Sequence, residues 1–284
     1  MEEKTLFSKP WKIFFFETLF FSLTFLFGLS SAYKINSYLV KKEIKVAPIS
    51  PLNFLLTFFI TTSIVLFLLY FLRFKKGKSI FFKIALAFSF FVGGLLFLYI
   101  WIPVLPAAIL MTILIFWWLK SPTVFNHNLC LILGMAGIGA NLGLKIMPTV
   151  GVIILISLSI YDWIAVYKTK HMVKMAKEMI EMGVISALII PQSVSSFKSS
   201  LANVKPGGEF LVLGGGDVVL PLIFAVSLIP FGVLKSAIVA LFSLIGATAN
   251  FFVFVRQKER KPMPALPLIS FFSIIGYLIT LLLK

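Results

Sequence analysis

Residues 210–224 read FLVLGGGDVVLPLIF, an apolar stretch that holds three consecutive glycines and one acidic residue, Asp217. A second apolar stretch, LISLSIYDWIAVY at residues 155–167, likewise contains one acidic residue, Asp162. An ionisable side chain inside a membrane-length segment is costly and by default marks a function. Because the whole chain has only ten acidic residues, we expect these two aspartates to work as a pair.

The composition is that of a membrane protein. Hydrophobic residues make up 60% of the 284 residues and charged residues 13%, about half the share of roughly 25% that is usual in soluble domains. The mean hydropathy is +1.05. The net charge of +16 comes from Lys and Arg between the apolar stretches, where membrane proteins carry flanking positive charges. The sequence therefore predicts an all-α, polytopic protein of the lipid bilayer, with no soluble domain and no nucleic-acid partner.

Nine apolar stretches approach the length of roughly 20 residues that a transmembrane helix needs. They lie near residues 11–32, 52–72, 80–102, 104–119, 127–144, 148–167, 210–229, 232–255 and 264–283. Pro103 and Pro106 divide the third from the fourth, because residues 84–119 would be too long as one span. We expect an N-terminal six-helix part (1–167), a cytosolic loop with an amphipathic helix (168–208) and a C-terminal three-helix part (209–284).

Nine spans place the two termini on opposite sides of the membrane. The N-terminal side carries 19 of the 26 Lys and Arg, and the other side carries 7. Cytoplasmic loops are enriched in Lys and Arg, so the count predicts a cytoplasmic N-terminus and an extracytoplasmic C-terminus. At 1.5 Å per residue, Asp162 lies about 8 Å and Asp217 about 11 Å from the cytosolic end of its span. We expect the two carboxyl groups to meet in the cytosolic half of the membrane.

Two carboxyl groups in one low-dielectric site do not both ionise easily, so the pair holds a single proton near neutral pH. The ionised aspartate then serves as a general base for water and the protonated one as a general acid. Other hydrolytic chemistries lack their residues: there is no HExxH motif, and the two histidines, His127 and His171, lie at span edges or in loops. We expect no metal and no cofactor.

Three further elements surround the aspartates. Gly214 to Gly216 indicate either close helix packing or a flexible backbone that admits water and an extended peptide. The hydroxyl of Tyr161 either bonds within the site or belongs to a ring at the membrane interface. The segment KPMPALP at residues 261–267 opens the last span with three prolines, which prevent a regular helix start. It is either a plain loop end or irregular backbone that lines a cavity.

Together these elements resemble the GxGD intramembrane aspartyl proteases, the presenilin and signal peptide peptidase family. The matching residues are Tyr161-Asp162, the LGxGD motif from Leu213 to Asp217, and the PAL motif Pro264-Ala265-Leu266. The resemblance implies a nine-span presenilin-like fold with Asp162 and Asp217 as the catalytic dyad. It also implies that a set of neighbours shapes the active site and contacts substrate: Tyr161, Leu213, Gly214, Gly215, Gly216, Pro264, Ala265 and Leu266.

The resemblance further implies how substrate is held. In the family a transmembrane helix of the substrate unwinds and its extended part adds as a strand. Residues 209–213 and 184–190 are the strand-like candidates for this role. The orientation is presenilin-like, and the compact chain is similar to the archaeal homologues, which act without partner subunits. The loop from about 166 to 208 is shorter than in eukaryotic presenilins, which are cut within it during maturation, so the resemblance leaves open whether this loop is cleaved.

The sequence leaves several features and one rival function open. Residues 168–183 form a basic amphipathic pattern, typical of a helix on the membrane surface or of a gate. Glu17 lies near the cytosolic end of the first span, where it can pair with a loop lysine. The GxxxG of Gly139 and Gly143 predicts helix packing. The alternative function is a proton- or cation-coupled transporter, although the first half of the chain holds no matching broken span. A prepilin peptidase also uses GxGD but lacks the PAL motif.

Overall fold

The computed structural model describes residues 10–44, 75–204, 209–257 and 261–283, together with isolated positions between 47 and 64. Most of the second expected span, near 52–72, lies outside the described residues. The other eight expected spans correspond to helices. They are α1 (Pro10–Lys41), α3 (Lys75–Leu98), α4 (Val104–Lys120), α5 (Val124–Gly143), α6 (Pro148–Trp163), α8 (Gly215–Ser227), α9 (Val233–Val255) and α10 (Leu266–Leu282). The count of nine spans and the three-part division of the chain stay predictions.

The helices have the length and surface of a multi-pass membrane protein. By length and composition, four described helices suffice to cross a membrane: Pro10–Lys41, Ser79–Leu98, Pro148–Lys168 and Val233–Val255. Three shorter helices are also apolar, Val104–Lys120, Gly215–Phe231 and Leu266–Leu282. Large apolar side chains are exposed along the bundle, for example Leu105, Ile113 and Phe116 of α4. Such a surface is suited to lipid, because water would make its exposure costly.

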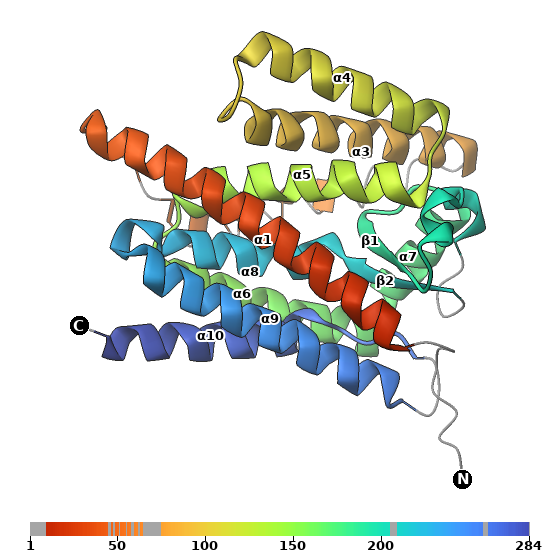
Figure 1. Ribbon diagram of the computed structural model, residues 1–284. Coiled ribbons are helices and arrows are strands. Elements are labelled where there is room, and N and C mark those ends of the chain that lie inside the picture. Colours follow the sequence, from red (N-terminus) through yellow and green to blue (C-terminus); the bar gives the residue numbers. More distant parts are fainter. Residues whose placement is uncertain are drawn as a thin grey trace.

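The helices form a layered bundle around α5 (Figure 1). Helices α3 and α4 form one outer layer against α5, whereas α6, α8, α9 and α10 lie on its other side, and α1 crosses the bundle. A small assembly comprises α7 (His171–Glu181) and the strands β1 (Ala187–Pro191) and β2 (Phe210–Gly214). It lies at the end of the bundle where α1 begins, and α10 ends at the opposite end.

Glycines let α5 approach its neighbours closely, as the GxxxG pattern predicts. A Cβ atom added at Gly139 would lie 2.5 Å from Leu222 of α8. One added at Gly143 would lie 2.5 Å from the Val226 side chain and 2.7 Å from the Ile223 carbonyl oxygen, also on α8. Small residues at such positions let the backbones of membrane helices approach closely, and the close approach adds dispersion contacts. The GxxxG therefore fixes the position of α8, the helix that carries Asp217.

The expected seventh span is wrong at its start. Residues 210–214 form strand β2 rather than the first turns of a helix, and α8 begins only at Gly215. The reason is local: Phe, Leu and Val favour an extended strand, and three glycines disfavour helix. Strand β1 then supplies an antiparallel partner, with Ala187 opposite Gly214 and Ile189 opposite Val212. Asp217 consequently lies in the first turn of α8 and not about seven residues into a helix.

Helical structure continues beyond Asp162 toward α7. Helix α6 ends at Trp163, the residue after Asp162, and continues into a π-helical turn, Ile164–Lys168. Lys170 then adopts a left-handed conformation with φ of 55°, and α7 begins at His171. The amphipathic pattern of residues 168–183 is therefore a helix over 171–181. The two strand-like segments, expected as partners for substrate, pair with each other in the structure.

Candidate active site

Asp162 is the penultimate residue of α6, and its side chain is 7% exposed. Helix α6 packs against α8 and α10, so the carboxyl group faces the inside of the bundle. Its Oδ2 atom is buried and has no hydrogen-bond partner among the described residues. A buried carboxyl oxygen without a donor is unfavourable for folding and points to a function.

Asp217 is the third residue of α8 and is partly exposed to a cavity. The backbone of Gly214 interacts with its carboxyl group. The first turn of a helix leaves backbone N–H groups unpaired and carries the positive end of the helix dipole, so a carboxylate is stabilised there. The strand-to-helix transition at Gly214–Gly215 thus gives Asp217 its position.

The two aspartates meet at one backbone donor. The backbone N–H of Leu266 interacts with the carboxyl groups of both Asp162 and Asp217, and the two groups are close enough to interact electrostatically. Leu266 begins α10. The N-termini of α8 and α10 therefore converge on the pair, where their dipoles favour the single negative charge of a half-protonated dyad.

The PAL residues are buried beside the pair. Ala265 and Leu266 are 6% and 4% exposed, and Pro264 is also buried. Pro267 occupies the first turn of α10, where its missing N–H costs no helix hydrogen bond. The segment before Leu266 is irregular backbone that lines the cavity through Ala265. The sequence predicts either a plain loop end or cavity-lining backbone for this proline-rich stretch, and in the structure the stretch lines the cavity.

The three glycines differ in what surrounds them. A Cβ atom added at Gly214 would lie 2.8 Å from Oδ2 of Asp217, and one at Gly215 would lie 3.2 Å from the carbonyl oxygen of Ser186. A Cβ atom at Gly216 would meet nothing within 4 Å. Gly214 and Gly215 thus permit close packing, whereas Gly216 leaves open space next to Asp217.

Tyr161 is turned toward the start of α7. Its hydroxyl lies 3.1 Å from Nε2 of His171, whose Nδ1 lies 2.6 Å from Oγ1 of Thr169. This contact joins the end of α6 to the beginning of α7, across the π-helical turn. Tyr161 is therefore in contact with the loop side of the site, and a role for its hydroxyl in catalysis stays a prediction.

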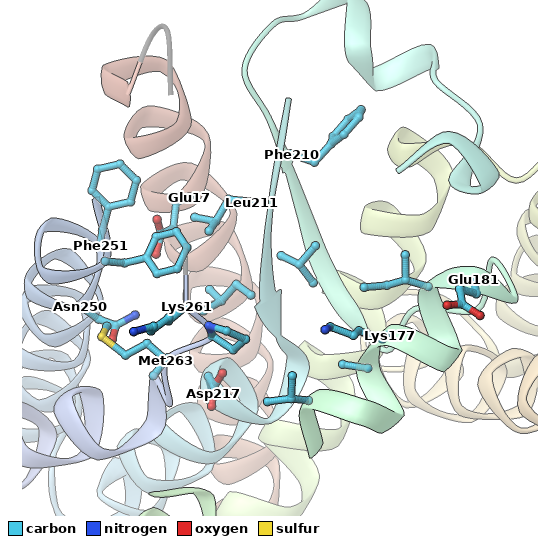
Figure 2. Close-up of a pocket in the computed structure, with 18 residues that line it drawn as sticks. Glu17, Lys177, Glu181, Phe210, Leu211, Asp217, Asn250, Phe251, Lys261 and Met263 are labelled. Atoms are coloured by element: carbon cyan, nitrogen blue, oxygen red, sulfur yellow. The ribbon is translucent and has the colours of Figure 1, made fainter. Parts of the chain in front are cut away.

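A cavity of about 480 Å³ opens beside Asp217 (Figure 2). Its walls come from α1, α7, residues 210–213 of β2, the end of α9 and the segment before α10. In Figure 2, Glu17, Asn250 and Lys261 lie on one side of β2, and Lys177 and Glu181 lie on the other. Leu213 and Ala265 line the cavity, whereas Asp162 does not. The cavity is thus an apolar chamber with a few charged side chains, of a size suited to a short extended peptide.

Side chains of α5 hold the outer edge of β1. The Asn128 amide donates to the Ile189 carbonyl oxygen at 2.7 Å and accepts from the Ile189 N–H at 2.9 Å. His127 Nε2 lies 3.0 Å from the carbonyl oxygen of Ala187. Both side chains are buried. They replace a neighbouring strand, so the edge of β1 away from β2 is already satisfied.

These two residues were not identified as site residues from the sequence. From the sequence, His127 is only a histidine at a span edge. The available signal was a pair of adjacent polar residues, His127-Asn128, at the start of an apolar span. Within the described ranges, no group of three or more His, Cys, Asp or Glu is placed to hold a metal ion.

Comparison with known proteins gives this arrangement a family. The family described as "Signal-peptide peptidase, presenilin aspartyl protease" matches residues 26–284. Two solved structures of a presenilin family intramembrane aspartate protease, in P2 and C222 space groups, each superpose with a TM-score of 0.63 at 22% identity. Each superposition covers 94% of this chain, and 97% and 99% of the respective solved chain. No curated protein sequence matches the chain.

A multi-pass helical bundle with paired aspartates beside a cavity is the arrangement of an intramembrane aspartic protease. The chain belongs to the signal-peptide peptidase and presenilin family of aspartyl proteases. Its fold is presenilin-like, and it is an enzyme, an intramembrane-cleaving aspartic protease of presenilin type.

Proposed function

We propose that this protein hydrolyses peptide bonds within or near the transmembrane helices of single-span membrane proteins. The observation that carries the proposal is the convergence of Asp162 and Asp217 on the Leu266 N–H, next to the cavity. The residues that meet there come from the end of α6, the first turn of α8 and the first residue of α10.

In the proposed mechanism, Asp162 and Asp217 share one proton. The ionised carboxylate takes a proton from water, and the resulting hydroxide adds to the scissile carbonyl carbon. The protonated aspartate hydrogen-bonds the carbonyl oxygen and stabilises the developing charge. The C–N bond then breaks as the amide nitrogen accepts a proton from the dyad, releasing an amine and a carboxylic acid. No metal or cofactor takes part in this sequence.

Substrate binding is proposed to occur by strand addition to β2. Ile189 uses its N–H and C=O on Asn128, so in an antiparallel pair these groups point away from β2. By the same alternation, the backbone N–H and C=O of its partner Val212 point away from β1. That edge faces the cavity, which Val212 lines. An unwound substrate segment can therefore pair with Val212 and extend toward Asp217.

The proposal includes an orientation. The excess of Lys and Arg on the N-terminal side supports a cytoplasmic N-terminus and an extracytoplasmic C-terminus. Strand β2, which leads directly into the first turn of α8 and so to Asp217, lies toward the end of the bundle where α1 begins (Figure 1), which supports a site in the cytosolic half of the membrane. The cavity and both aspartates are supplied by this chain, which supports activity without obligatory partner subunits.

The test is proteolysis by the purified protein, reconstituted in liposomes with single-span substrates, with the cut mapped by mass spectrometry. Asp162→Asn and Asp217→Asn are expected to abolish cleavage while the protein keeps its thermal unfolding profile. A peptide analogue with a hydroxyl in place of the scissile carbonyl is expected to inhibit. Full activity of either aspartate variant would reject the dyad. Proton or cation flux through the liposomes without proteolysis would support the transporter instead.

A further inference from the structure

Glu17 is a third acidic side chain inside the bundle, and the proposed reaction does not use it. It lies on the inward face of α1, with Ile13, Phe20 and Phe21 one helical turn away, all buried. The side chain is 4% exposed, and its Oε2 atom has no hydrogen-bond partner among the described residues. A buried carboxyl oxygen without a donor is costly unless a ligand supplies one.

A second unsatisfied acceptor lies on the neighbouring helix. Asn250 of α9 is 7% exposed, and its Oδ1 atom likewise lacks a partner in the described part of the chain. Helices α1 and α9 pack together through Phe14, whose ring lies 5.4 Å from the ring of Phe251. Glu17 and Asn250 therefore sit on adjacent walls of the chamber that also contains Asp217 (Figure 2).

The ligand that fits two buried acceptors, one of them acidic, is a cation that carries several N–H donors. A charge-assisted hydrogen bond is stronger than a neutral one, and a buried carboxylate is stable only when paired. The substrate itself brings such a group: single-span proteins carry Lys and Arg at the cytosolic border of their span. The other charged side chains that line the chamber are Lys177, Glu181, Asp217 and Lys261.

We infer that Glu17 and Asn250 form a subsite that binds a lysine or arginine side chain of the substrate. The subsite rests on the proposed function. A substrate strand on β2 runs along Phe210 to Leu213, between this subsite and Asp217. Anchoring one basic side chain therefore fixes the register of the strand, and the register decides which peptide bond reaches the dyad. Glu17 is in this sense a specificity-determining residue.

The test uses one single-span substrate in which a lysine is moved through successive positions on the cytosolic flank of the cut, each compared with glutamine at the same position. For the unaltered protein, lysine at one position is expected to raise kcat/KM by at least about tenfold over glutamine. Glu17→Gln is expected to reduce this ratio to within about twofold. Glu17→Lys is expected to shift the preference to glutamate at that position.

Glu43→Gln is the matched control, because it removes the same charge from an exposed residue beyond the far end of α1 and should keep the lysine preference. If Glu17→Gln does not fold, Asn250→Leu gives the same comparison. A lysine preference that survives in Glu17→Gln, or that is missing from the unaltered protein at every position, overturns the subsite. Cleavage that persists in Asp217→Asn instead overturns the proposed function, so the two failures are distinguishable.

Discussion

A Cβ atom added at Gly214 would lie 2.8 Å from Oδ2 of Asp217. The backbone of Gly214 has φ of −55° and ψ of 135°, values that alanine adopts without strain. The glycine is therefore required for space beside the carboxyl group and not for its conformational freedom. The sequence alone does not distinguish close packing from backbone flexibility as the role of these glycines. At Gly214 the structure indicates close packing.

Gly214→Ala is expected to displace the Asp217 carboxyl group and to lower kcat/KM by about a hundredfold, as small misplacements of catalytic groups do. Because the backbone is unstrained, thermal unfolding should change little. Gly134→Ala is the control, since its Cβ would make only ordinary contacts at 3.9 and 4.0 Å. Gly214→Ala with full activity would show that Asp217 is not confined as described.

Asn128→Leu is expected to lower the free energy of unfolding by about 2–4 kcal/mol, because the N–H and C=O of Ile189 are left buried without partners. Ile189 is 0% exposed, so water does not replace the amide. The measurements are thermal unfolding and hydrogen exchange of the Ile189 amide. Asn141→Leu is the control on the same helix, because Asn141 donates to the Gly137 carbonyl oxygen of its own helix and accepts only a long hydrogen bond, 3.4 Å, from the Tyr99 hydroxyl. Equal effects of the two variants would argue against a specific role in holding β1.

The elements predicted best from the sequence were those set by local pattern. Apolar length predicted the helices, and small residues at Gly139 and Gly143 predicted a packing contact. The YD, GxGD and PAL motifs predicted the residues of the candidate site, and the structure brings Asp162, Asp217 and Leu266 together. Their roles in catalysis stay predictions until the variants are measured.

The features that were missed depend on contacts between distant segments. Residues 210–214 are apolar, and the sequence therefore predicts them as part of a span. They form a strand because β1 pairs with them, and β1 is itself held by the hydrogen bonds between Asn128 and Ile189, here called the clamp. The clamp joins residues 61 positions apart. The spacing of hydrophobic residues does not predict a contact between such distant segments. The only local indication of this contact is the pair of polar residues at the start of α5.

Gly143→Ala is expected to destabilise the protein by about 1–3 kcal/mol, as overpacking in a close-packed interior does. The added Cβ would lie 2.7 Å from the backbone carbonyl oxygen of Ile223, which cannot rotate away. Gly139→Ala should cost less, because the atoms it meets belong to the flexible Leu222 side chain. Thermal unfolding of the two variants in the same detergent gives the comparison. The reverse order would contradict the α5–α8 contact as described.

Val212→Pro tests whether the free edge of β2 receives substrate. The Val212 N–H points away from β1, so proline removes a donor that the strand pair itself does not use. The protein should therefore keep its fold, whereas cleavage of a transmembrane substrate should fall by about tenfold or more, since one main-chain hydrogen bond to the substrate and the space beside it are lost.

Leu213→Pro is the matched comparison for this prediction. Leu213 lies opposite Leu188, one residue along from the Val212–Ile189 pair. Because hydrogen-bonded and non-hydrogen-bonded pairs alternate, the N–H of Leu213 faces β1. This variant should lower thermal stability as well as activity. Active Val212→Pro protein with an unchanged KM would place the substrate elsewhere in the chamber and remove the argument for strand addition. A loss confined to cleavage, with Tm unchanged, would instead identify the backbone of Val212 as a substrate contact.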